Sequence, residues 1–151
     1  MVITCSDTRT PESDTSGYRI IHMLKDAGHA VLAYQLVKDD PKKIKAKIKA
    51  GLTNKKIQAV IINGGTGISR RDSTFEAVDA MLEKRLDGFG EVFRFLTYQD
   101  IGSPAIMSRA TAGIIKSRIL FSMPGSENAV KLAMEKLILP ELGHLIQQLS
   151  K

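Results

Sequence analysis

The sequence is poor in cysteine, aromatic residues and long apolar runs, and each scarcity argues against a class of protein. Its single cysteine, Cys5, rules out an internal disulfide and is typical of a chain in a reducing compartment, which favours the cytoplasm. No apolar run approaches the roughly 20 residues of a membrane-spanning helix, so we expect no membrane association. Aromatic residues make up only 5% of the chain and offer few rings for stacking on nucleic-acid bases.

The composition is that of one globular domain. At 151 residues the chain can bury one sizeable core and is too short to argue for two, so a single domain is expected over residues 1–151. Apolar residues at 43% and charged residues at 25% are ordinary values for such a domain. Met1 is followed directly by Val2–Thr4, which looks like the end of a buried strand with no approach to it, and the sequence leaves open whether the natural N-terminus is trimmed.

Basic residues exceed acidic residues by six, which favours an anionic partner. Much of the excess lies in five lysines interleaved with Ile44 and Ile48 at helical spacing: Lys42, Lys43, Lys45, Lys47 and Lys49. This pattern is typical of a solvated helix face. A nucleic-acid surface is the less favoured interpretation, because no aromatic set or known binding motif accompanies the lysines.

Strand-like and helical patterns alternate along the chain. Strand-like runs, mostly without strict polar alternation, occupy Val2–Thr4, Val31–Val37, Ala59–Asn63 and Ile119–Met123. Helical patterns occupy the stripe from Ile20 to Ala27, a segment opening with Asp40 as cap and Pro41 at the first position, and residues 74–85, 89–99, 104–112 and 128–149, with a kink expected at Pro140. This order predicts an α/β fold with a mostly parallel sheet and helices on both faces.

Ligands of such sheets bind at the carboxyl ends of the strands. Four segments that follow predicted strands are rich in small, hydroxyl and acidic residues, namely Cys5–Thr8, Lys38–Asp40, Gly64–Gly67 and Pro124–Ser126. The sequence therefore predicts one site at this edge, assembled from segments far apart in the chain.

Two of these segments could bind an anion through their backbone. The Gly64–Gly67 turn lets amides approach a phosphate without interference from Cβ atoms. It matches neither the dinucleotide fingerprint nor the Walker phosphate loop, and a purely structural turn is an equal alternative. The same two interpretations apply to Pro124–Ser126.

Asp39 and Asp72 are the candidates for acid chemistry. Asp72 suits the start of a helix as well as it suits catalysis, and the following Ser73 and Glu76 have the spacing of a capping box. Asp39 has no helix role that the sequence shows, because Asp40 is the residue placed to cap the next helix. Two carboxylates from different loops near phosphates would suit Mg²⁺.

The remaining reactive side chains form no catalytic pattern. The three histidines, His22, His29 and His144, have neither metal-ligand spacing nor a nucleophile partner. Cys5 is interpreted as a small buried hydrophobe at the end of a strand, with ligand contact as the alternative.

Five segments make the chain resemble the family of MoaB and MogA proteins of molybdopterin biosynthesis, which is related to the G domains of plant Cnx and animal gephyrin. They are VITCSDTRTPESDTSG, VKDDP, GGTGISRRDSTFEAV, GFGEVFRFLTYQDIGSPAIMSRATAGI and FSMPGSENAV. The resemblance runs nearly end to end, and GFGEVFR and MPGS look more like the MoaB branch. One departure is Phe75, where the family pattern often has proline.

The resemblance implies a three-layer α/β/α domain that binds molybdopterin and ATP. It implies transfer of AMP to the terminal phosphate of the pterin, with Mg²⁺ and with release of pyrophosphate. The essential aspartates of active members map onto Asp39 and Asp72, the catalytic and metal-binding candidates. Substrate contacts map onto Ser6, Gly64, Gly65, Thr66, Gly67, Ser108, Pro124, Gly125 and Ser126.

The resemblance also implies a symmetric homotrimer or homohexamer. We expect exposed apolar side chains at Phe89, Phe93 and Phe95 to be covered by neighbouring copies. The alternative to an enzyme is a non-catalytic molybdopterin carrier or scaffold of the same fold. Some members of the MoaB branch lack the two aspartates and look inactive, so their presence here favours an enzyme.

Overall fold

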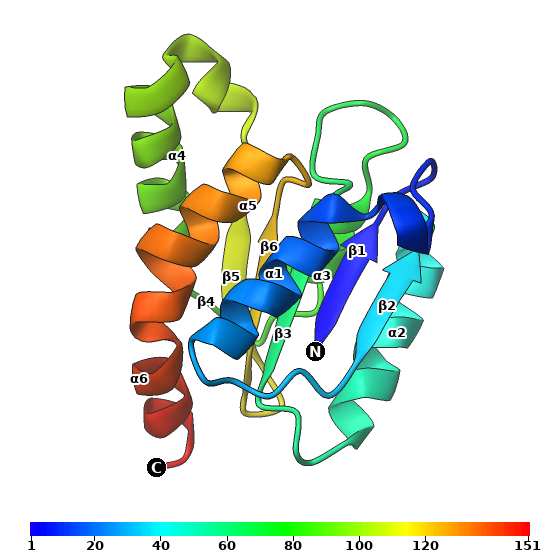
Figure 1. Cartoon of the computed structure of the whole chain (residues 1–151), viewed down its shortest axis with the longest axis vertical. Helices are drawn as coiled ribbons and strands as arrows, with labels where there is room; N and C mark the ends of the chain where they lie inside the picture. The colour runs from blue at the N-terminus through cyan, green and yellow to red at the C-terminus, as the bar shows by residue number, and fades with distance from the viewer.

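The computed structural model describes all residues from Met1 to Lys151 and shows strands and helices alternating around one sheet (Figure 1). The strands are β1 (Val2–Cys5), β2 (Tyr34–Val37), β3 (Ala59–Asn63), β4 (Lys84–Arg85), β5 (Thr111–Ile115) and β6 (Arg118–Met123). The α-helices are α1 (Thr15–Asp26), α2 (Pro41–Thr53), α3 (Thr74–Asp79), α4 (Asp87–Ile101), α5 (Glu127–Ala133) and α6 (Leu139–Leu149). Three short segments are a 3-10 turn η1 (Pro11–Ser13), a second one η2 (Ser103–Met107) and a π-helical turn η3 (Met134–Ile138).

The six strands have the order β2-β1-β3-β6-β5-β4. The first four are parallel to one another, β5 is antiparallel to β6, and β4 is antiparallel to β5. The register pairs Thr4 with Asn63 and Asn63 with Met123, so β1, β3 and β6 end level with one another. The predicted α/β fold with a mostly parallel sheet is confirmed.

Helices cover both faces of the sheet (Figure 1). One core cluster joins the sheet to α1, α4, α5 and α6 through residues such as Ile20, Phe93 and Val130. The other joins it to α2 and α3 through Ile44 and Val78. Because consecutive strand residues face opposite sides, strands buried on both faces read as continuous aliphatic runs. None of the helices combines the length and the apolar character that a membrane crossing needs.

The cap that was predicted for α2 is present. Asp40 accepts hydrogen bonds from the amides of Lys42 and Lys43, at 2.8 and 3.2 Å, and Pro41 is the first helical residue. The cap fixes where the β2 segment ends and α2 begins. Asp39, the residue before it, is thereby placed at the carboxyl end of the sheet.

Three predicted segments differ from the structure. The second strand-like run was expected from Val31, but β2 begins only at Tyr34. The helix expected over 74–85 ends at Asp79, because Lys84 and Arg85 pair with β5 as a short antiparallel strand. The helix expected over 104–112 is η2 followed by β5, whose Thr111–Ile115 pairs with β6. The β4–β5 pairing joins distant segments, whereas β5 and β6 form a hairpin through Lys116 and Ser117. Both pairings overrode the local helical patterns.

The last helix is irregular at the place where a kink was expected. Its three parts, α5, η3 and α6, follow one another without a break. Pro140 has no N–H to give to the carbonyl four residues earlier. In the turn before it, the amide of Leu139 bonds to the carbonyl of Met134, five residues back. The proline therefore coincides with a wider turn in a continuous helix.

The exposed apolar surface differs from the predicted one. Phe93 is fully buried and Phe89 packs partly against the same core, so only Phe95 of the three phenylalanines is exposed. The exposed apolar side chains of α4 and η2 are Val92, Phe95, Tyr98, Ile101, Ile106 and Met107. Phe89 and Phe93 stack on each other and pack into the core on this face of the sheet, where Phe89 also contacts Phe121 of β6.

Candidate functional site

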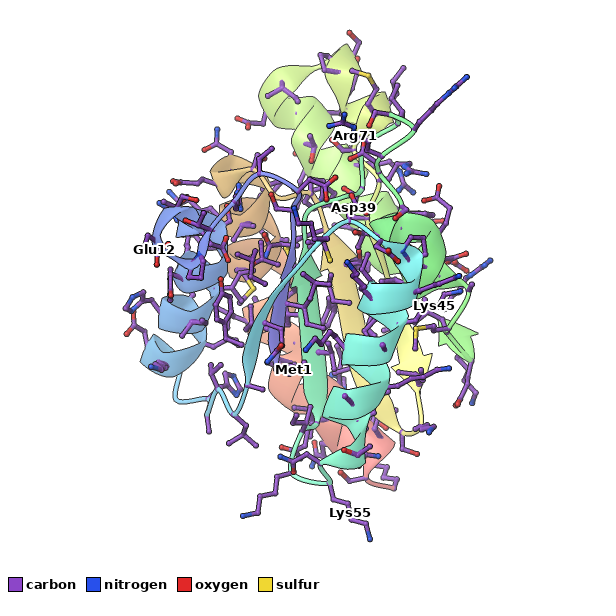
Figure 2. The ribbon with its side chains drawn as sticks, turned by 90° about the vertical axis from the view of Figure 1, so that its right-hand side faces the viewer. Met1, Glu12, Asp39, Lys45, Lys55 and Arg71 are labelled. Atoms are coloured by element: carbon purple, nitrogen blue, oxygen red, sulfur yellow. The ribbon has the colours of Figure 1, made fainter.

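An open cleft of about 420 Å³ lies at the carboxyl ends of β1, β3 and β6. Its lining consists of Cys5, Ser6, Thr8, Arg9, Gly64, Gly65, Thr66, Gly67, Asp72, Met107, Ser108, Pro124 and Gly125. All but two of the predicted site residues therefore line one cleft, and the two exceptions are Asp39 and Ser126. In Figure 2, Asp39 and Arg71 lie toward the same end of the molecule, whereas Lys55 is at the opposite end.

The glycine turn approaches its neighbours too closely for side chains. Gly64 and Gly65 have positive φ angles of 95° and 61°, which favour glycine. A Cβ on Gly64 would overlap the carbonyl oxygen of Cys5. The turn therefore needs glycine for both its conformation and its packing.

The amide groups of this turn have no acceptor in the protein. The N–H groups of Gly65, Thr66, Gly67 and Ile68 make no hydrogen bond, whereas the carbonyls of Gly65, Thr66 and Gly67 all accept one. A row of free donors beside an open cleft is the arrangement with which backbone binds anions. The turn can hold phosphate oxygens.

Asp39 lies beside the glycine turn and caps α3 from another loop. Its Oδ1 accepts hydrogen bonds from the amide and hydroxyl of Ser73, at 3.1 and 2.8 Å, and from the Thr74 hydroxyl at 3.3 Å. The sequence shows no helix role for Asp39, and the structure adds this one at the start of α3. A Cβ on Gly65 would overlap its Oδ2, an atom that accepts no hydrogen bond in the protein.

The expected capping box of α3 is absent. The Ser73 hydroxyl points to Asp39 and caps nothing, and Glu76 pairs with Arg109. The start of this short helix is already supplied with a carboxylate, because Asp39 accepts from the Ser73 amide, the role that the capping-box spacing assigned to Glu76. Residues more than 30 positions apart provide the cap, which no local pattern reveals.

Asp72 lines the cleft and supports its own loop. Its Oδ2 accepts hydrogen bonds from the amide and hydroxyl of Ser69, at 2.9 and 2.6 Å, so its contacts are with the loop and not with α3. A Cβ on Gly67 would overlap the same carboxylate. Asp39 and Asp72 therefore flank the glycine turn at Gly65 and Gly67, and each keeps one oxygen free of hydrogen bonds.

Arg9 also lines the cleft, although the sequence analysis did not single it out. Its guanidinium donates to the carbonyl of Gly125 at 2.8 Å and to Asp14 Oδ1 at 3.1 Å. These contacts join the segment after β1 to the segment after β6. Arg9 adjoins the predicted Cys5–Thr8 segment, so extending that segment by one residue would have found it.

Asp14 is fully buried below Arg9 and also caps α1. Burial alone would raise the pKa of its carboxyl group. Hydrogen bonds from Thr4, Tyr34 and the Gly17 amide, together with the charge of Arg9, outweigh burial and bring the pKa below its ordinary value. Asp14 is therefore an ionised group that holds Arg9 at the cleft.

The other predicted positions separate into two groups. Ser6 is in the cleft, where its hydroxyl accepts from the amides of Thr8 and Arg9. Ser126 is outside the lining and caps α5 by accepting from the Ala129 amide at 3.3 Å.

Burial raises the pKa of the Cys5 thiol to about 12, so this cysteine is no nucleophile at neutral pH.

Replacing Gly65 by valine is expected to abolish ligand binding in the cleft. A side chain here would overlap Asp39 and the Thr74 hydroxyl, and a β-branched residue is strained at a positive φ. The matched control is Gly28→Val, where φ is 83° but no atom lies within 4 Å of the added Cβ. Calorimetry with molybdopterin would contradict the expectation if Gly65→Val bound as tightly as Gly28→Val.

Comparison with known proteins agrees with this geometry. Residues 1–144 match the family described as "Probable molybdopterin binding domain". Molybdenum cofactor biosynthesis protein B of Bacillus subtilis is 53% identical over 99% of this chain and 89% of its own length. The crystal structure of a molybdenum cofactor biosynthesis protein B superimposes with a TM-score of 0.96 at 52% identity, over 99% of this chain and 93% of that chain.

A more distant relative has the same architecture. The tungsten cofactor synthesizing protein MoaB from Pyrococcus furiosus superimposes with a TM-score of 0.81 at 38% identity, over 99% of this chain and 95% of that chain. The family match covers most of the residues that carry the fold and all the residues of the cleft. The chain therefore belongs to the molybdopterin-binding domain family of molybdenum cofactor biosynthesis, in its MoaB and MogA group.

Proposed function

We propose that this protein transfers AMP from ATP to the terminal phosphate of molybdopterin. The observation that carries the proposal is the pair of carboxylates, Asp39 and Asp72, on either side of a turn whose amides are free to bind phosphate. Membership of the molybdopterin-binding family supports molybdopterin as the substrate that accepts AMP. A reaction between two phosphates needs positioning and charge stabilisation and no covalent nucleophile.

The donor set is compatible with Mg²⁺ that is held partly by substrate. No cluster of three or more His, Cys, Asp or Glu side chains forms a metal cage. Mg²⁺ is commonly bound by one or two carboxylates plus substrate phosphates and water. The free oxygens of Asp39 and Asp72 fit that role, and a bound Mg²⁺ would neutralise charge that develops on the phosphates.

The chain's own residues would position the reactants. The amides of the glycine turn bind phosphate oxygens, and Arg9 adds a fixed positive charge held by Asp14. An oxygen of the pterin phosphate then attacks the α-phosphorus of ATP while the bond to the β-phosphate breaks. Pyrophosphate leaves, and the pterin carries AMP.

A non-catalytic molybdopterin carrier is the second candidate. One observation favours it: Asp39 already accepts three hydrogen bonds as the cap of α3, so a structural role could explain this carboxylate without chemistry. The free oxygen on each aspartate favours the enzyme.

The two candidates separate in one experiment. Purified protein is incubated with molybdopterin, ATP and Mg²⁺, and the products are analysed for adenylylated pterin and pyrophosphate. The enzyme forms both and stops when Mg²⁺ is chelated. Tight binding of molybdopterin with neither product would establish the carrier.

A homotrimer or homohexamer is proposed as the assembly. The exposed apolar side chains of α4 and η2, from Val92 to Met107, would be covered by neighbouring copies. Light scattering over a range of protein concentrations should give a mass of three chains or more. Phe95→Asp should shift the population towards the monomer because it places a charge in the contact, and a wild-type monomer at every concentration would remove the proposal.

A further inference from the structure

The side chain of Arg109 is the main link between the glycine turn and α3. Arg109 lies between η2 and β5, one residue after the predicted Ser108. Its Nε donates to the carbonyl of Thr66 at 2.8 Å and its Nη2 to the carbonyl of Gly67 at 2.5 Å. The same guanidinium forms an ion pair with Glu76 in the first turn of α3.

Phe75 completes the environment of this guanidinium. Its ring centroid lies 4.8 Å from the central carbon of Arg109, within the range of a cation–π contact. Phe75 is the position at which the family pattern often has proline, so this contact belongs to the departure noted in the sequence. The hydrogen bond from Arg109 lowers the pKa of Glu76, as expected for a carboxylate that stays ionised in the pair.

The carbonyl contacts determine where the amides of the turn point. All peptide bonds of the chain are trans, and in a trans peptide unit the C=O and the following N–H point in opposite directions. With the carbonyls of Thr66 and Gly67 directed at Arg109, the N–H groups of Gly67 and Ile68 are directed away from it. The Gly65 carbonyl is bound in the same way by the Thr74 amide at 2.9 Å, which turns the Thr66 N–H.

We propose that Arg109 is a positioning residue. It holds the carbonyls of Thr66 and Gly67 and so orients the amides of Gly67 and Ile68, which together with the Thr66 amide oriented by Thr74 form a binding site for a phosphate group. Arg109 is assigned no direct phosphate contact, because the two carbonyls and Glu76 already accept from its Nε, Nη1 and Nη2 groups. The proposal rests on the proposed function only in identifying the anion as a phosphate of the substrates.

The test uses inorganic pyrophosphate as the probe, so it does not depend on adenylylation. In ¹⁵N NMR spectra of the wild-type protein, pyrophosphate should shift the amide signals of Thr66, Gly67 and Ile68. The side-chain Nε signal of Arg109 should stay in place. A large shift of that Nε signal, or no shift of the three amides, would overturn the positioning role.

Arg109→Lys is the informative variant, because lysine keeps the charge and loses the planar fork that reaches two carbonyls. Pyrophosphate binding should weaken by about tenfold or more, the scale of effect expected from misplaced binding groups. The matched control is Arg85→Lys, since Arg85 forms a comparable ion pair with Asp79 of α3 outside the cleft. Equal weakening in both variants, or none in Arg109→Lys, would contradict the proposal.

Two further measurements keep the proposal testable if Arg109→Lys folds poorly. Phe75→Leu and Glu76→Gln each remove one support of the guanidinium and leave the carbonyl contacts in place, so both should weaken pyrophosphate binding more than the control Arg85→Lys does. In Arg109→Ala, added guanidinium at low concentration should restore the amide shifts, whereas ammonium should not. Failure of guanidinium to restore them in the folded variant would count against the proposal.

Discussion

Replacing Asp72 by asparagine is expected to slow adenylylation by about 10²-fold or more, the scale seen when one preorganised electrostatic group is lost. Asparagine retains an oxygen that can accept from Ser69, so the loop should keep its shape while the free carboxylate oxygen loses its charge. Folding and molybdopterin binding should persist. The measurement is AMP transfer at saturating ATP and Mg²⁺, and near-normal turnover would return Asp72 to a purely structural role.

Asp39→Asn should behave in the same way, because an amide oxygen can still accept the hydrogen bonds from Ser73 and Thr74 that cap α3. Asp40→Asn is the matched control: it is the neighbouring acid, and it caps α2 outside the cleft lining. Since both site aspartates would serve one reaction centre, the double variant should lose far less than the product of the two single losses. Fully multiplicative losses would argue that they act separately.

Asp14→Ala is expected to lower the free energy of unfolding by about 1–3 kcal/mol, because it leaves the Tyr34 hydroxyl and the buried Gly17 amide without their acceptor. The carboxylate is fully buried and accepts from Arg9, Tyr34 and the Gly17 amide. Asp14→Asn keeps the shape and an acceptor and should cost less. Urea unfolding of the three proteins measures the difference, and a loss below about 1 kcal/mol in Asp14→Ala would contradict the role assigned to this carboxylate.

The effect of Asp14 should depend on pH in a defined direction. Its pKa is lower in the folded protein than the ordinary value of 3.8, so its charge contributes stability above that value. The contribution is lost as the pH falls through the lower folded pKa. The difference in stability between the wild type and Asp14→Asn should therefore narrow on acidification, and a difference that widened below pH 3.8 would have the wrong sign.

The sequence was most informative where one segment sufficed for the inference. The aliphatic runs and the Asp40–Pro41 start located most of the parallel sheet and α2, because burial on both faces and capping are local signals. The rule that ligands bind at strand ends then grouped Ser6, the glycine turn and Gly125, which all line the same cleft. None of these inferences required knowledge of a distant partner.

Most of the missed features depend on distant partners. Asp39 caps a helix 34 residues away, and Arg109 binds carbonyls more than 40 residues earlier. The short strand β4 exists only because β5 is beside it. Arg9 and Arg109 each adjoin a predicted position, so the signal was nearby, but the contacts that give them a role appear only in the folded chain.

The wide turn at η3 lets one helix keep a four-residue rhythm against the sheet. Val130, Met134, Ile138 and Leu142 are all buried and each is four residues after the last. A uniform α-helix has 3.6 residues per turn, so by Leu142 this row would have rotated about 120° away from the sheet. The π-helical turn has more residues per turn than an α-helix, so it offsets much of that rotation and keeps the row facing the sheet. Pro140, which in the sequence predicts a kink, thus lies just after the turn that keeps the buried row of this helix facing the sheet.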